Sequence, residues 1–234
     1  MRVYPVAMVP QVLSVFRIKI CGVRLKKDVQ AVEQSGGDAI GLNFFPPSIR
    51  YLDPALPTTR ELSEAASELG LTRVGVFVNE SPGRVIEIAE RVGLDAIQLH
   101  GEEPLEVASD IIRRGWRVIR AIKLPRTPVD ADAMDALITP WQDLGCHTLL
   151  DADAGASHGG SGKTLHWPSV RVWSERNPGG AWTLAGGLKP ENIAEAIAAT
   201  GARSVDTASG VECPRGAKNA GRVSDFISAS GLTP

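Results

Sequence analysis

Two ionisable side chains, Cys21 and Asp151, stand at the ends of short apolar runs in the sequence. A carboxyl group that faces a thiol can move a proton on and off one small substrate, which is general acid and base catalysis. Both residues also have a structural interpretation, because buried cysteines are usually inert and an aspartate can cap the segment after a strand. The residue types therefore predict a proton-transferring pair.

Two glycine-containing turns, Gly186-Gly187 and Ser209-Gly210, follow the last two apolar runs. In an eight-stranded α/β barrel, the loops after strands seven and eight commonly hold a phosphate group. Glycine lets an anion approach backbone N–H groups, and a short helix after the turn adds a positive dipole end. One glycine pair alone would indicate a simple chain turn, but two turns at the two expected places favour a phosphate site.

Three further side chains are candidates for contacts with a substrate. Arg50 lies on the proline-stiffened loop 46–50, and it is either a surface charge or a bidentate clamp for a carboxylate. His100 follows the fourth apolar run, and it either lines a pocket or only forms a hydrogen bond to a loop. The sequence favours neither interpretation. Asp206 ends the eighth run. These positions predict a polar rim around one pocket.

The segment 159–164, Gly-Gly-Ser-Gly-Lys-Thr, ends like a Walker A phosphate-binding loop. The full pattern needs a glycine where this chain has Ser157, and Pro168 interrupts the long helix that would have to follow. We therefore expect a mobile glycine-rich loop over the site instead of a nucleotide site. The histidines show neither a helical pair nor a cluster with cysteine, so no metal is expected.

The elements that must position these residues are β-branched runs alternating with segments of helical periodicity. From Arg17 onward, eight such units follow at nearly constant spacing, which is typical of repeated βα units. Eight units in this length favour a closed (β/α)8 TIM barrel over a flavodoxin-like or Rossmann sheet, whose G-x-G-x-x-G turn is missing. The expected strands are 17–21, 38–43, 72–78, 95–99, 117–122, 147–151, 181–185 and 203–207.

Proline and glycine indicate the helix boundaries. Ser81-Pro82 and Lys189-Pro190 place a proline in a first turn, where its missing N–H costs nothing. The pattern is loose at 52–60 and 124–145, but neither segment resembles a linker between domains. One barrel domain at 17–234 is expected after an N-terminal extension at 1–16. Left-handed caps are expected at Gly36, Gly93, Gly115 and Gly201.

Composition limits the class of protein. Lys and Arg number 25 against 27 Asp and Glu, and the formal charge of -2 gives no general attraction to nucleic acid or anionic membranes. Hydrophobic residues make up 43% and the longest apolar runs have strand length, so neither disorder nor a membrane span is expected. Three widely spaced cysteines indicate a reducing cytoplasm more than a disulfide framework.

Several ordered blocks occur through nearly the whole chain from Lys19. They are Lys19-Ile20-Cys21-Gly22, 45–51 (FPPSIRY), 74–79 (VGVFVN), 98–102 (QLHGE), 159–164 (GGSGKT), Ala185-Gly186-Gly187-Leu188 and Ser209-Gly210-Val211-Glu212. Together they resemble the phosphoribosylanthranilate isomerase family. Ile49 replaces the proline usual before the arginine, and Arg215 and Asn219 alter the segment before the last helix. These departures bear on loop geometry and affinity more than on the reaction.

The resemblance implies an Amadori rearrangement of N-(5'-phosphoribosyl)anthranilate in tryptophan biosynthesis, without a cofactor. It implies that Asp151 is the general acid that opens the furanose ring. Cys21 is then the base that removes the proton from the second sugar carbon, and Arg50 binds the anthranilate carboxylate. The implied phosphate site is Gly186, Gly187, Ser209 and Gly210. The expected partner is a small phosphoribosyl substrate, and the chain is expected as a monomer or homodimer.

Two alternatives remain open at this point. An isomerase of histidine biosynthesis or an indole-forming synthase would carry carboxylates or a lysine where this chain has Cys21. A noncatalytic phosphosugar-binding barrel would keep the glycine turns, and the intact Cys21 and Asp151 disfavour it.

Overall fold

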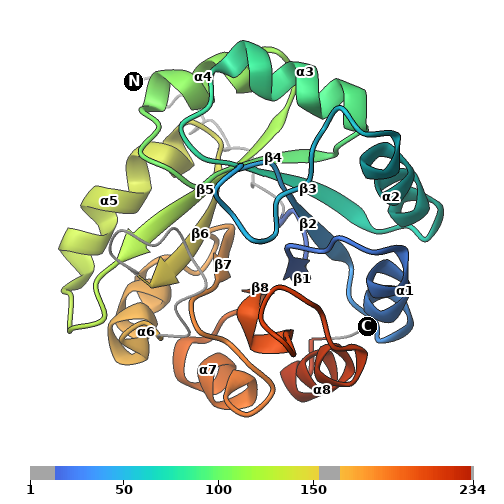
Figure 1. Ribbon diagram of the computed structural model, residues 1–234. Coiled ribbons are helices and arrows are strands. Elements are labelled where there is room, and N and C mark those ends of the chain that lie inside the picture. The colour runs from blue at the N-terminus through green and yellow to red at the C-terminus, as the bar shows by residue number, and fades with distance from the viewer. Residues whose placement is uncertain (1–13, 153–163, 233–234) are drawn as a thin grey trace, which may run out of the picture.

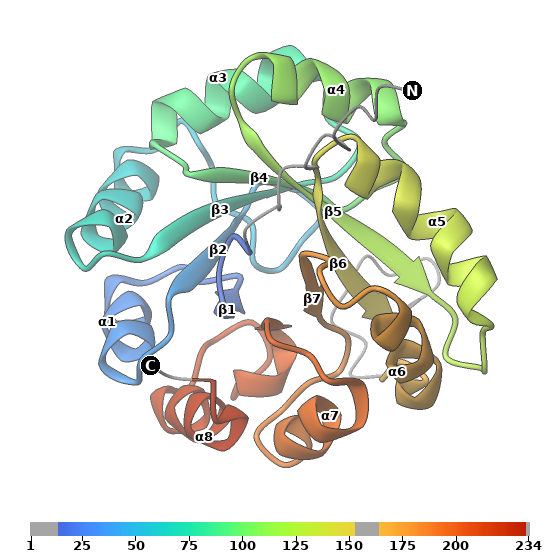
Figure 2. The same cartoon turned by 180° about the vertical axis from the view of Figure 1, so that it is seen from behind.

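The computed structural model describes residues 14–152 and 164–232. Eight parallel strands close into a barrel in the order β1-β2-β3-β4-β5-β6-β7-β8, and the helices form a ring around it (Figures 1 and 2). Closure is made by β1 (Ile18–Cys21) and β8 (Val205–Thr207), which pair with Lys19 opposite Asp206. The predicted (β/α)8 barrel is confirmed, and the open sheet is excluded.

All eight predicted strands are present, with ends that differ from the prediction by at most a few residues. The other strands are β2 Ala39–Asn43, β3 Thr72–Phe77, β4 Ala96–Leu99, β5 Arg117–Leu124, β6 His147–Ala152 and β7 Trp182–Leu184. The helices are α1 Lys26–Gln34, α2 Pro57–Glu68, α3 Pro82–Val92, α4 Leu105–Arg113, α5 Ala131–Asp143, α6 Trp167–Arg176, α7 Ile193–Thr200 and α8 Ala220–Ser230, with a 3-10 turn η1 at Ser209–Val211. None of these helices has the length and apolar character that a membrane crossing requires.

Helix α3 begins and ends as predicted. Pro82 occupies its first turn, the Ser81 side chain accepts a hydrogen bond from the Arg84 N–H, and Gly93 ends it in the left-handed conformation. Helix α7 begins later than the prediction from Lys189-Pro190. The carbonyl of Lys189 accepts from the N–H groups of Asn192 and Ile193, so a separate turn precedes the helix.

Alternation along the strands divides the apolar side chains between two cores. Ile18 and Ile20 of β1 belong to the outer core between strands and helices, so Lys19 and Cys21 face the barrel interior. The inner core contains four alanines among its nine residues. It consists of Val15, Phe16, Ala39, Val74, Ala96, Ile119, Ala121, Leu149 and Ala185.

The amino-terminal end of the barrel is closed by Phe16, which is 3% exposed. Its carbonyl accepts a hydrogen bond from Ser204 Oγ, which lies 2.7 Å from Thr183 Oγ1. Thr183 Oγ1 in turn lies 2.7 Å from His147 Nε2. Most of the predicted extension, residues 1–13, lies outside the described residues, but its last part packs as inner core.

Candidate active site

A cavity of about 410 Å³ lies at the carboxyl ends of the strands. Gly210 is not part of its wall. It packs behind the wall instead, where a Cβ atom would overlap the carbonyl oxygen of Leu188. The structure therefore brings the other residues predicted from the sequence together in one cavity. Those in the wall are Cys21, Arg50, His100, Asp151, Gly186, Gly187, Asp206 and Ser209.

Cys21 is the last residue of β1 and lies against the backbone of β2. A Cβ atom at Gly41, its partner in the sheet, would lie 2.7 Å from the Cys21 Sγ atom. Glycine at this position therefore leaves the space that the sulfur occupies. The thiol is thus set into the cavity wall by the strand pairing.

The cations around Cys21 oppose the effect of its burial. Burial raises the pKa of the thiol, and the cations Lys19, Lys218 and Arg50 lower it, while Asp206 raises it further. The net result is a pKa above the ordinary value, so the free protein holds a neutral thiol at neutral pH. When such a group does lose its proton, the thiolate is a correspondingly strong base.

Lys19 lies one inward position before Cys21 and is fully buried. Its Nζ atom is 2.8 Å from Oδ1 of Asp206. Burial alone would lower the pKa of Lys19, but attraction to Asp206 and to Cys21 raises it above the ordinary value. Lys19 therefore remains charged beside the thiol. It was not among the residues predicted from the sequence, although a lysine within an apolar strand, two positions before Cys21, was the available signal.

Asp151 forms a chain with two residues of the fourth unit. Its Oδ2 atom lies 3.4 Å from His100 Nε2, and His100 Nδ1 lies 2.9 Å from the Gln98 side-chain nitrogen. An amide that donates to Nδ1 leaves the proton of a neutral imidazole on Nε2, which is the nitrogen nearer to the carboxyl group. Gln98 was also missed, and it too is an inward polar residue two positions before a predicted one.

The turn after β7 approaches the end of β6. Gly186 and Gly187 both have positive φ, +83° and +64°, which non-glycine residues rarely adopt. A Cβ atom on Gly186 would lie 2.6 Å from the Ala152 backbone nitrogen and 3.0 Å from Asp151 Oδ1. Glycine at this position lets the predicted phosphate turn lie directly beside the predicted acid.

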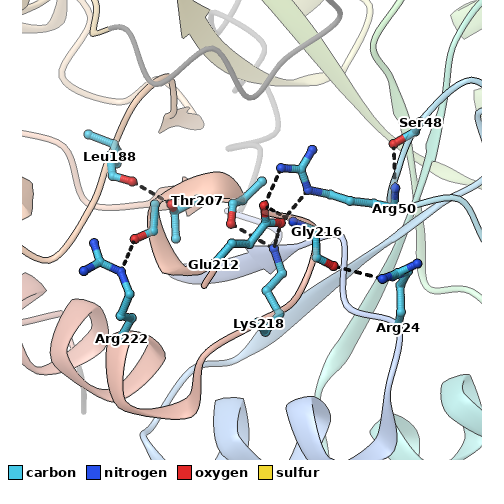
Figure 3. Close-up of polar contacts among 11 residues, drawn as sticks. Arg24, Ser48, Arg50, Leu188, Thr207, Glu212, Gly216, Lys218 and Arg222 are labelled. Carbon is cyan, nitrogen blue, oxygen red and sulfur yellow. Dashed lines mark hydrogen bonds and ion pairs between the residues drawn. The ribbon is translucent and has the colours of Figure 1, made fainter. Parts of the chain in front are cut away.

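Arg50 is bound by a residue that the sequence argument did not single out. Its Nε and Nη2 atoms donate to the two carboxylate oxygens of Glu212, at 2.6 and 2.7 Å (Figure 3). Glu212 also accepts hydrogen bonds from Lys218 Nζ and from the Gly216 N–H. Burial alone would raise the pKa of Glu212, but the bonds and charges of Arg50 and Lys218 lower it to about 2.

Two further expectations concern the loop after β6 and metals. Residues 153–163 lie outside the described residues, and with them all of the predicted glycine-rich loop except Thr164. Among the residues that are described, no three His, Cys, Asp or Glu side chains are grouped as metal ligands would be.

A sequence model of the family described as N-(5'phosphoribosyl)anthranilate (PRA) isomerase matches residues 18–229. The chain belongs to this family. It is 40% identical to the N-(5'-phosphoribosyl)anthranilate isomerase of Myxococcus xanthus over 214 residues, which cover 92% of this chain and 95% of the relative. The same enzyme of Thermotoga maritima is 37% identical over 92% of this chain and 99% of its own length.

Solved structures of this isomerase family have the same fold. The crystal structure of phosphoribosyl anthranilate isomerase from Thermotoga maritima matches with a TM-score of 0.78 and 35% identity, over 92% of this chain and 98% of that one. A structure of phosphoribosyl anthranilate isomerase in complex with reduced 1-(o-carboxyphenylamino)-1-deoxyribulose 5-phosphate matches with a TM-score of 0.74 and 32% identity, over the same shares. The resemblance seen in the sequence blocks is confirmed, which decides against the other phosphosugar enzymes.

Proposed function

We propose that this chain converts N-(5'-phosphoribosyl)anthranilate to 1-(2-carboxyphenylamino)-1-deoxyribulose 5-phosphate, the third step from chorismate to tryptophan. The observation that carries the proposal is one cavity, in a chain of this isomerase family, whose wall contains both Cys21 and Asp151. A solved relative carries the reduced form of this product, which gives the proposal its substrate class.

The first step falls to Asp151. As general acid it protonates the furanose ring oxygen, and the bond from that oxygen to the first sugar carbon breaks. The lone pair of the anthranilate nitrogen forms the Schiff base that replaces it. His100, 3.4 Å away, orients the carboxyl group during this transfer.

The second step falls to Cys21. Its thiolate removes the proton from the second sugar carbon, and the electron pair moves into the enolamine. The enolamine then becomes the ketone, because the hydroxyl on the second carbon loses its proton and the first carbon gains one. Hydrogen and electrons only change place within the substrate, so the proposed reaction needs no external oxidant or reductant, and we propose it without a cofactor.

The remaining wall residues are assigned to substrate binding. Gly186, Gly187 and Ser209, with Gly210 behind them, would hold the phosphate through backbone N–H groups. Arg50 would bind the anthranilate carboxylate. His100 and Asp206, which share the cavity wall with the two reacting groups, would contact the sugar.

We place the reaction in the cytoplasm, because Cys21, Cys146 and Cys213 are free thiols of the kind a reducing compartment maintains. The partner is a small phosphoribosyl compound, with no nucleic acid or membrane. A solved structure of the Thermotoga maritima relative describes that protein as dimeric. For this chain we propose a monomer or a homodimer.

The test is the decay of fluorescence of freshly made phosphoribosylanthranilate with the purified protein. We expect Cys21→Ala and Asp151→Asn each to lower kcat by about 10²-fold or more, the scale of a lost acid or base. Cys146→Ala is the matched control, because Cys146 is a buried free cysteine of the outer core. Near wild-type turnover in either site variant would contradict that role, and an inactive wild type would favour the noncatalytic binding barrel.

A further inference from the structure

We propose that Glu212 is a positioning residue, which holds Arg50 so that one edge of its guanidinium group faces the substrate carboxylate. The inference rests on the proposed function, in which Arg50 binds the anthranilate carboxylate. It assigns a role in substrate selection to a residue outside the cavity wall.

The geometry of the pair leaves part of the guanidinium group available. A guanidinium has five N–H donors. Glu212 accepts from Nε and Nη2 of Arg50, which are the atoms of one side of the group. Nη1 points away from Glu212 (Figure 3). Arg50 belongs to the cavity wall and Glu212 does not, so the edge left by Glu212 is the one that a ligand in the cavity can reach.

The charges of the cluster favour a carboxylate at that edge. Glu212 lies between two cations, since Lys218 Nζ is 2.8 Å from the same Oε1 atom that Arg50 contacts. Its low pKa, about 2, keeps it ionised at any pH where the protein works. The cluster therefore carries one positive charge in excess. The side chains of Arg50, Glu212 and Lys218 are 10%, 1% and 2% exposed, so water screens this excess charge only weakly.

The position of Arg50 is fixed before any substrate arrives. Its backbone N–H donates to Ser48 Oγ, and its side chain passes so close to Gly22 that a Cβ atom there would overlap it. Glu212 is held in turn by the Gly216 N–H. A guanidinium that is already ordered loses less conformational freedom on binding, so the effect of Glu212 should be on affinity for the carboxylate.

Lys218 connects this cluster to the proposed phosphate end. Its Nζ atom donates to the carbonyl oxygen of Ala208 at 2.8 Å, as well as to Glu212. Ala208 and Ser209 are neighbours in the cavity wall. The two ends of the proposed substrate site thus share one set of charged contacts.

The test compares two substrates of the Glu212→Gln variant. One is N-(5'-phosphoribosyl)anthranilate, and the other is the analogue made from ribose 5-phosphate and aniline, which lacks only the carboxylate. For N-(5'-phosphoribosyl)anthranilate we expect kcat/KM to fall by about 10- to 100-fold. The change should be mainly in KM, because Arg50 binds the carboxylate equally well in the bound substrate and in the transition state. For the analogue we expect a change below about 3-fold, because it has no carboxylate for Arg50 to bind.

Three variants serve as comparisons. Arg50→Lys should reproduce the selective loss. An ammonium group lacks the planar set of donors that lets a guanidinium bind the Glu212 carboxylate on one edge and the substrate carboxylate on another. Glu103→Gln is the matched control. Glu103 is likewise a buried carboxylate paired with an arginine, Arg120 at 2.6 Å, but it lies outside the cavity wall. It should leave the preference between the two substrates as in the wild type. Glu212→Asp provides the same comparison if Glu212→Gln does not fold.

Equal losses for both substrates would overturn the inference, because a general structural role predicts them. A lower KM for the carboxylated substrate in Glu212→Gln would also overturn it, since Glu212 would then compete with the ligand. If the wild type turns over the anthranilate compound and only Arg50→Lys shows the selective loss, the inference fails while the proposed function stands. A wild type inactive on both substrates would overturn the proposed function itself.

Discussion

Asp151 is held by His100, whose Nε2 atom lies 3.4 Å from its Oδ2 atom, and Gln98 holds the other nitrogen of the same imidazole. Gln98 is 1% exposed and sits on β4 two positions before His100. Strand β4 and the residue after it thus orient the proposed acid on β6 from across the intervening strand β5.

Replacing His100 with Leu should lower kcat by about tenfold, because Asp151 loses the polar neighbour, 3.4 Å away, that orients it. Gln98→Leu should have a smaller effect, since the imidazole remains but its tautomer is no longer fixed. Steady-state kinetics measure both. His166→Asn is the control, because His166 caps α6 and lies outside the cavity wall. A wild-type kcat in His100→Leu would show that His100 does not orient Asp151 for the reaction.

Replacing Lys19 with Met should move the pH dependence of turnover to higher pH. Lys19 lowers the pKa of Cys21, so its removal raises that pKa and reduces the thiolate fraction at any given pH. The variant also leaves Asp206 buried without its cation. In the double variant Lys19→Met/Asp206→Asn the upward shift should be smaller, because Asp206 itself raises the pKa of Cys21. The pH profile of kcat/KM and thiolate absorbance report the shift. Coincident profiles for the wild type and Lys19→Met would refute it.

His147 should make the protein less stable in acid. Burial, with a smaller contribution from Arg117, lowers its pKa to about 3, whereas the unfolded chain has the ordinary value near 6.5. The neutral imidazole therefore contributes stability fully above about pH 6.5, and this contribution is lost as the pH falls toward 3, by up to about 1.4 kcal/mol per pH unit. Urea unfolding at several pH values measures the slope. His147→Gln should reduce the dependence of the free energy of unfolding on pH. The same slope in the variant and the wild type would contradict the role of His147.

Gly186→Ala should lower both stability and activity. Its Cβ atom would lie 2.6 Å from the Ala152 nitrogen, so the turn after β7 would have to move away from Asp151. Gly93→Ala is the matched control, because Gly93 has a similar φ of +75° and its nearest neighbour is 3.9 Å from the new atom. Backbone strain alone should cost each about 1 kcal/mol. Only Gly186→Ala should lose turnover, and equal activities would contradict the role of that turn.

The barrel was predictable because its strands are nearly continuous apolar runs at regular spacing. The residues at the strand ends followed from the rule that parallel strands of a barrel bring their carboxyl ends to one rim. The start of α7 was misplaced because Lys189-Pro190 makes a separate turn, in which Asn192 bonds back to the Lys189 carbonyl. A proline indicates a first turn but does not show whether the helix continues from it.

The missed residues of the site fall into two groups. Lys19 and Gln98 lie one inward step before Cys21 and His100, so the alternation of a strand could have indicated them. Glu212 could be read as part of a family block, but its bond to Arg50 joins residues 162 positions apart in the chain. Sequence spacing does not indicate such a pairing, because the two residues come together only when β1 and β8 pair to close the barrel.

That same bond joins an early part of the chain to a late part. Arg50 emerges from the ribosome early, whereas Glu212 and Lys218 follow the last strand. A nascent or truncated chain that ends before them would already contain Cys21 and Asp151, yet its arginine would have no partner to hold it. In the proposed site, the contacts that hold Arg50 are therefore completed by the segment between the last strand and the final helix.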